Sequence, residues 1–269
     1  MYRKYNPRVW IVLAVALVAA ADLSTDLSAE ARRAKVEARS ATADVSDRQT
    51  QVIPLPPAKP LSIEVTIGSV RIDGWDRPDV AITVERRAPD KAQLARVPLA
   101  IDDTPARPSV RALQTDNTTD PACRTDVTIR VPRTALIDRV QVLEGRIAIE
   151  GFTGTLTADI RRGPIDGKSV SGTLRLEAGI GSVTLTDARL SANGLLRLRS
   201  FNGDVRLSLA ARPADARIMA LALNGHVKSD IPLTRRDTWG PRWGETTIGK
   251  GEPVISIDVV TGTIEIKSP

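Results

Sequence analysis

The sequence predicts an all-β protein whose repeat region is a single-stranded parallel β-solenoid, similar to a β-helix, with two short strands per coil. Apolar and polar residues alternate with a period of two from Leu61 onward, which is typical of strands with one buried face. Glycine also recurs at a fixed phase after residue 145, and no segment long enough for a helix separates the short strands. An antiparallel β-sandwich is the alternative, because its short strands also follow one another at intervals of roughly 8 to 12 residues.

The N-terminus has the three parts of a secretory signal peptide in residues 1–21. The opening MYRKYNPR contains three basic residues and no acidic one, thirteen apolar residues follow at 9–21, and the run ends in alanines. Such a run is short for a membrane span, which needs about 20 apolar residues. We expect cleavage after Ala21, with Ala31 as the second choice, or an uncleaved signal anchor. Either would place the folded part outside the cytoplasm, in the periplasm or at the cell surface.

The composition excludes several kinds of partner and chemistry. Loss of residues 1–21 would leave 35 basic and 32 acidic residues, which lowers the net charge from +6 to +3. Both signs are interspersed, so we expect no nucleic-acid partner, while attraction to an anionic envelope surface stays open. Cys123 is the only cysteine, so no intramolecular disulfide can form. Its thiol is either a tolerated structural residue or a reactive group.

A spacer is expected to lead from the signal to the folded domain. Residues 22–60 are first rich in alanine and charge, without an apolar stripe that a helix could bury, and then contain the proline-rich IPLPPAKP. We expect the β-repeat domain to cover 61–269. Within it, 88–122 is interpreted as an irregular excursion with one strand at RVPLAID, and 234–247 as an inserted loop.

The repeat unit is a glycine followed by two aliphatic residues at alternate positions. Gly145, Gly154, Gly163, Gly172 and Gly181 are nine residues apart. The unit occurs as GSVRI, GRIAI, GTLTA, GTLRL, GSVTL, GLLRL, GDVRL and GTIEI. Alternation turns both aliphatic side chains to one face, and stacked parallel copies would bury that face, with the glycine allowing the turn between strands. Two units would form one coil of about 18 residues.

Longer motifs follow one another in a characteristic order. They are VTIGSVRIDGWDRPDVAITVERRA, VTIRVPRTALIDRVQVLEGRIAIEGFTG, the glycine units, SFNGDVRLSL and the closing GKGEPVISIDVVTGTIEIK. Over roughly 61–269 this order resembles the bacterial β-strand-repeat family catalogued as putative adhesins, whose function is unknown. The resemblance implies an exported or envelope-associated, mostly β, solenoid-like domain. It supplies no catalytic residues.

No catalytic, metal-binding or cofactor-binding residues are predicted. His226 is the sole histidine, which excludes a two-histidine metal site, and its position beside a repeat glycine favours an exposed strand residue. Asp73, Asp76 and Asp79 could suggest calcium, but they lack the dense acids of a strong calcium loop. We therefore interpret DGWDRPD as a polar turn.

Four basic residues are candidates for an interaction surface because they fall at outward positions of the repeat. They are Arg175, Arg197, Arg206 and Lys228. Stacked coils would join them into a basic ladder, which could contact an anionic polymer or serve only as a solvated face.

Two tryptophans form a second candidate. The segment WGPRWGE carries Trp239 and Trp243 in a stretch broken by glycine and proline. Tryptophan and arginine together are typical interface anchors. The same residues could instead fold back over the open last coil, which is the interpretation we favour.

The sequence therefore predicts a non-enzymatic structural or adhesin-like interaction domain of the bacterial envelope. A polysaccharide-active β-helix enzyme is one alternative and would use Glu177 or Asp187 as a catalytic carboxylate. A partner of an envelope-stress regulator is another. The partner is expected to be an unidentified envelope component or protein, with membrane contact only through an uncleaved N-terminus. Open ends would allow end-to-end self-association.

Overall fold

The computed structural model describes most of the chain after residue 43. The described ranges are 44–115, 119–236 and 241–269. The predicted signal peptide at 1–21, the first part of the predicted spacer and Trp239 lie outside them. Within these ranges, no helix is both long enough and apolar enough to cross a membrane.

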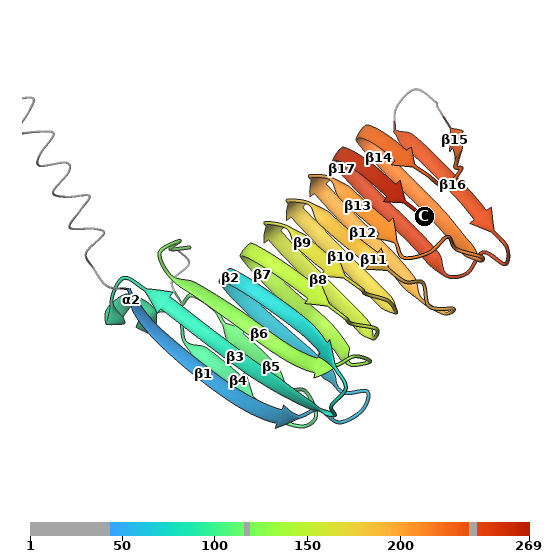
Figure 1. The fold of residues 1–269 in the computed structure, drawn as a ribbon. Coiled ribbons are helices and arrows are strands. Elements are labelled where there is room, and N and C mark those ends of the chain that lie inside the picture. The colour runs from blue at the N-terminus through green and yellow to red at the C-terminus, as the bar shows by residue number, and fades with distance from the viewer. Residues whose placement is uncertain (1–43, 116–118, 237–240) are drawn as a thin grey trace, which may run out of the picture. The chain divides into compact units, whose positions relative to one another are not determined.

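The chain divides into two compact units, and the second, Val45–Pro269, contains all the described helices and strands (Figure 1). Its strands are β1 (Val45–Pro54), β2 (Pro60–Trp75), β3 (Asp79–Ala88), β4 (Leu99–Asp102), β5 (Ser109–Ala112), β6 (Arg124–Pro132), β7 (Leu136–Glu150), β8 (Thr155–Arg162), β9 (Ile165–Lys168), β10 (Thr173–Ile180), β11 (Val183–Ala188), β12 (Leu195–Asn202), β13 (Val205–Leu209), β14 (Ala216–Ser229), β15 (Thr234–Arg236), β16 (Arg242–Ile248) and β17 (Val254–Lys267). One short helix, α2 (Lys91–Ala95), follows β3. These strands all join one sheet of 17 strands.

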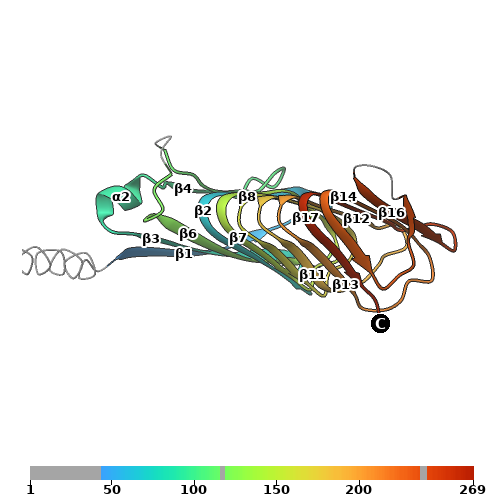
Figure 2. The ribbon, with the colours of Figure 1, turned by 90° about the horizontal axis from the view of Figure 1, so that it is seen from above.

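Four long strands, β2, β7, β14 and β17, take part in two rows of strands. β7 pairs with β8 along its first half and with β9 along its second, and β17 pairs likewise with β12 and β13. The first row runs β15, β16, β14, β17, β12, β10, β8, β7, β2, β5, β4. The second runs β14, β17, β13, β11, β9, β7, β2, β6, β3, β1. Figure 2 shows them as two layers joined where the long strands bend.

The structure is all-β, but the predicted single-stranded parallel solenoid is wrong. β7, β8, β10, β12, β17, β13, β11 and β9 pair in parallel one after another, and β9 pairs again with β7, so 8 strands close into a parallel barrel. Further strands extend it, and the pairs β1–β3, β3–β6, β4–β5 and β14–β16 are antiparallel. The alternative antiparallel sandwich is also unsupported, because the central pairs are parallel.

The order of pairing explains this error. β17 is the last strand of the sequence, yet it lies between β12 and β14 in the first row and between β13 and β14 in the second. A period of two determines which side chains point inward, and glycine marks where the chain turns. Neither feature determines which strand lies beside which, so the sequence pattern could not reveal a closed set of pairings.

Inward side chains of neighbouring strands stack directly on one another and form the core. In the first row one such ladder is Leu156, Leu174, Leu196 and Ile255, and in the second row one is Ile147, Ile165, Val183, Val205 and Ile264. All of these side chains are buried, and both ladders belong to one apolar cluster. Since burying one such side chain contributes about 1.5–3 kcal/mol, the shared core between the rows is the main source of stability.

Glycines line the bend at which the two rows join. Gly163 has a φ of 135°, and a Cβ atom there would lie 1.8 Å from the carbonyl oxygen of Gly145 on the neighbouring strand. A Cβ at Gly181, where φ is 150°, would lie 2.0 Å from the carbonyl oxygen of Gly163. Only glycine combines this conformation with so close an approach. The nine-residue spacing follows because alternate glycines serve two bends, and Gly154 and Gly172 lie at the other one.

The β14 side of the core is covered by a segment that the sequence did not mark. Ile231, in the connection from β14 to β15, is buried. Leu233 of the same connection is partly buried and packs against the same core. Leu233 lies where a Cβ on Gly244 of β16 would meet it, at 3.1 Å. Most of the range expected to be a loop, 234–247, forms β15 and β16.

At the N-terminal end of the sheet, strands and a short helix lie in ranges that we expected to contain little regular secondary structure. β1 lies within the expected spacer and pairs antiparallel with β3 along its whole length, which buries Ile53. The expected excursion at 88–122 contains α2, β4 and β5, and β4 covers the last four residues of the predicted strand RVPLAID. Cys123 is buried there beside Ala88, Val97 and Ala112, and burial raises the pKa of its thiol.

Replacing Gly163 by alanine should destabilise the protein strongly. The new Cβ would overlap a backbone carbonyl of the neighbouring strand, so the strands must separate, and we expect a loss of about 3 kcal/mol in the free energy of unfolding. Gly251→Ala is the control, because Gly251 also has a positive φ of 80° but a Cβ there meets only a methyl group of Thr247 at 3.1 Å. Urea unfolding measures both. Equal losses would show that the close approach at the bend is unimportant.

Candidate binding surface

Three neighbouring strands of the first row, β8, β10 and β12, present a regular set of outward side chains. Their registers place one residue from each strand side by side at every outward position. After the first outward set, the next two are Thr157, Arg175 and Arg197, and then Asp159, Glu177 and Arg199; Arg161, Gly179 and Phe201 come at the following outward position of each strand. We call these residues the three-strand face.

Two of the predicted interaction residues, Arg175 and Arg197, lie directly opposite each other on this face. Both are exposed, and they are paired in register on β10 and β12. Adjacent strands are about 4.8 Å apart, and like charges directly opposite each other destabilise a sheet. Within the described ranges, no carboxylate forms an ion pair with either guanidinium. The two positive charges are therefore held close together, and neither is paired with a carboxylate of the described residues.

A pair of carboxylates lies beside the two arginines. Asp159 and Glu177 are directly opposite each other on β8 and β10, and Glu177 forms an ion pair of 3.6 Å with Arg199. Burial of its carboxyl raises the pKa of Asp159, and the negative charge of Glu177 raises it further.

A shallow groove lies where the three strands end. It has a volume of about 480 Å³, and both carboxylates of the pair contribute to its lining. Phe201 and Leu113 are 47% and 42% exposed there, and Leu143 adds a third apolar side chain. The groove therefore combines apolar contacts with groups that can accept hydrogen bonds.

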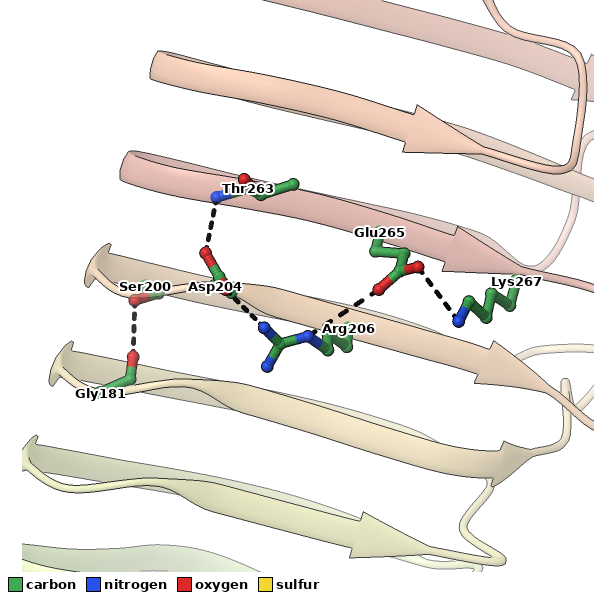
Figure 3. A network of polar contacts seen from close by, with 7 residues as sticks. All are labelled: Gly181, Ser200, Asp204, Arg206, Thr263, Glu265 and Lys267. Carbon is green, nitrogen blue, oxygen red and sulfur yellow. Dashed lines mark hydrogen bonds and ion pairs between the residues drawn. The ribbon is translucent and has the colours of Figure 1, made fainter.

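The other two predicted basic residues, Arg206 and Lys228, lie on the second row. Arg206 donates a hydrogen bond of 2.6 Å to Asp204 and lies 3.8 Å from Glu265 (Figure 3). Glu265 also contacts Lys267 at 3.1 Å, and Lys228 is in register with it on the next strand. The structure therefore does not bring the four residues into one ladder. On the second row, acidic side chains separate the basic ones.

Trp243 lies on β16, opposite Leu221 of β14, and is partly buried. With His226, Arg235 and Arg242 it lines a small hollow of about 130 Å³. His226 is exposed on β14, as expected for an outward strand position. The role of Trp243 as an anchor or as a cover stays a prediction.

The three acids of DGWDRPD, which runs from the end of β2 to the start of β3, each pair with an arginine. Asp73 is 2.9 Å from Arg71, Asp76 is 2.8 Å from Arg133, and Asp79 is 2.7 Å from Arg77. In the part of the chain that the structure describes, no three His, Cys, Asp or Glu residues form a group that could hold a metal ion. Asp187, a candidate acid of the enzyme alternative, accepts a hydrogen bond of 2.7 Å from Ser169.

Phe201 is the residue of the surface that sequence reasoning missed. The inward residues of β12 are Leu196, Leu198 and Ser200. Because inward and outward residues alternate along a strand, Phe201 faces outward. An aromatic residue at an outward position of an otherwise aliphatic repeat was the signal that could have identified it. Leu113 gave no such signal, because it comes from the excursion and reaches the groove only through the pairing of β5 with β2.

Replacing Glu177 by glutamine should lower the pKa of Asp159 without restoring its ordinary value of 3.8. The neighbouring negative charge disappears, while burial, the larger cause, remains. Carboxyl NMR titration measures this pKa. Glu64→Gln removes another carboxylate of the groove and should leave the pKa of Asp159 unchanged. The same shift in both variants, or none in Glu177→Gln, would contradict the described coupling.

Solved structures similar to this chain have low sequence identity to it. A putative cell adhesion protein from Clostridium sporogenes is 11% identical with a TM-score of 0.42, and the match covers 84% of this chain and 100% of that one. A putative adhesin from Bacteroides fragilis is 14% identical with a TM-score of 0.41, covering 82% and 97%. A putative lipid binding protein from Parabacteroides distasonis is 9% identical with a TM-score of 0.29, covering 82% and 96%. No family model matches the sequence, and no curated protein does.

Proposed function

We propose that this chain is a non-enzymatic interaction domain of the bacterial envelope that binds an anionic polymer through the three-strand face. The observation that carries the proposal is the pair Arg175 and Arg197. These guanidinium groups are opposite each other on adjacent strands, exposed, and without an acidic partner in the described residues. Such a pair costs stability in the free protein, and an external anion would relieve the repulsion.

The chemistry of arginine favours a polymer with carboxylate, sulfate or phosphate groups. A guanidinium group donates several hydrogen bonds in one plane and binds such anions with two of them at once. Two arginines at the spacing of adjacent strands would engage neighbouring anionic groups of one chain. The groove beside them offers Phe201 and Leu113 for apolar contact with the polymer backbone.

The arginines of the second row differ from Arg175 and Arg197, because several of them form ion pairs, and this supports the three-strand face as the binding surface. There Arg71 contacts Glu150 at 2.7 Å, and Arg146 contacts Asp166 at 2.8 Å. A face whose charges pair with each other gains little by binding an anion, because its own ion pairs would have to break. On the first row, Arg175 and Arg197 form no ion pair within the described residues.

The location and the partners belong to this proposal. Export to the periplasm or the cell surface rests on the signal-like residues 1–21, and membrane contact would occur only if that segment stays uncleaved. End-to-end self-association also stays a prediction. A regulatory protein as the partner would be the outcome if pull-down from envelope extracts captured one through the same face.

Replacing Arg175 and Arg197 together by glutamine should weaken binding to heparin, a sulfated polymer, by about tenfold or more, because each charged hydrogen bond contributes about 1.5–3 kcal/mol. The matched control, Arg206→Gln with Lys228→Gln, removes the same charge from the second row and should change affinity little. Calorimetric titration with heparin, and with dextran as the neutral polymer, measures both. Binding should weaken as salt is added.

Two outcomes would contradict the proposal. Equal losses in both double variants would mean that only net charge matters and that the three-strand face is not the site. A shortened polymer after incubation, with cleavage lost in Glu177→Gln, would instead support the polysaccharide-active enzyme.

A further inference from the structure

Three neighbouring loops differ from the turns that precede them at the same bend. The turns 151–154 and 169–172 are short, whereas 189–194, 210–215 and 249–253 are longer. The spacing between paired residues increases accordingly. Thr155 pairs with Thr173, 18 residues later, but Thr173 pairs with Leu195, 22 residues later. The longer loops follow β11, β13 and β16 (Figure 1). In repeat proteins, insertions gathered at one place often form the binding surface.

The three loops border an open pocket of about 910 Å³, which we call the loop cavity. This volume lies in the range of small-molecule sites, about 300–1,000 Å³. Ala188 and Pro253 at its base are buried, and Leu190 packs against the barrel core. Pro213 adds a further apolar surface. The base of the cavity can therefore receive an apolar group.

The lining of the loop cavity carries three basic side chains and three acidic ones. Arg189, Arg212 and Lys250 are exposed, one from each loop, and none of the three side chains forms an ion pair within the described residues. Their neighbouring acids Asp187 and Asp215 are otherwise engaged.

Those two carboxylates hold the loops in place. Asp187 accepts a hydrogen bond of 2.7 Å from the hydroxyl group of Ser169, and Asp215 accepts one of 2.7 Å from the backbone N–H of Lys250. Glu252 is the remaining acid of the lining and is exposed. Two of the three acids thus hold the loops in place, and none of the three basic side chains forms an ion pair with an acid of the lining.

We propose that the loop cavity binds an anionic amphiphile, with its apolar chain against Leu190 and Pro253 and its carboxylate or phosphate head between Arg189, Arg212 and Lys250. An apolar base with a few cations at its margin is the arrangement that such a molecule requires, since guanidinium and ammonium groups bind both kinds of head. The site lies apart from the three-strand face and does not depend on the function proposed there. A free fatty acid and a lipid phosphate share the chemistry.

Calorimetric titration below the micelle concentration tests this proposal with four probes. Dodecanoate and dodecyl phosphate carry both chain and anionic head, dodecyl maltoside carries the chain with a neutral head, and inorganic phosphate is the head alone. We expect one anionic amphiphile per chain, bound at least about tenfold more tightly than either partial probe. The tighter binder of dodecanoate and dodecyl phosphate indicates whether the site prefers a fatty acid or a lipid phosphate.

Two variants locate the site. Arg189→Gln with Arg212→Gln and Lys250→Gln should weaken amphiphile binding about tenfold or more, and Ala211→Trp should weaken it by filling space without changing charge. Arg175→Gln with Arg197→Gln should leave it unchanged, which separates this site from the three-strand face. Equally tight dodecyl maltoside, equally tight phosphate, no binding of either amphiphile, or full binding by the triple variant would overturn the proposal. Circular dichroism confirms that each variant is folded.

Discussion

The stacking of inward aliphatic side chains on parallel neighbouring strands is the constraint on which the rest of the structure depends. Each of the short strands β8 to β13 carries only one to three such side chains, which cannot form a core alone, and each gains its burial from the strands on either side. Continuous stacking requires the backbones to stay in contact through the bend. Positions such as Gly163 and Gly181 therefore have no room for a side chain. The packing of the core therefore determines the backbone conformation of the bend.

The same register that stacks the core also orders the outer surface. Outward residues of neighbouring strands lie side by side, so a charge recurring in the sequence becomes a row of charges in space. On the second row this brings opposite charges together, as with Arg206 and Glu265. On the first row it brings Arg175 beside Arg197. A rigid parallel sheet thus fixes the positions of both without any contribution from loops, while the inserted loops build the separate cavity at the bend.

The sequence predicted the class of secondary structure, the inward residues and the turn glycines, because these follow from local periodicity. It could not predict closure into a barrel, since this depends on β17 reaching back between β12 and β14 from a distance along the chain. It also joined Arg206 and Lys228 to Arg175 and Arg197, although successive strands alternate between the rows and the two pairs lie on different ones. The alternation of inward and outward residues could have predicted that Phe201 faces outward. Leu113, by contrast, reaches the groove through a tertiary pairing that no local pattern encodes.

Methyl NOE measurements on the folded protein test the central stacking order most directly. Leu198 is in register with Ile257, and Ile257 is in register with Ala220, so β17 separates Leu198 from Ala220. The account expects strong cross-peaks from the Ile257 methyl groups to those of both Leu198 and Ala220. A strong cross-peak between Leu198 and Ala220, with none from either to Ile257, would show that the strands stack in the order of the chain and would contradict it.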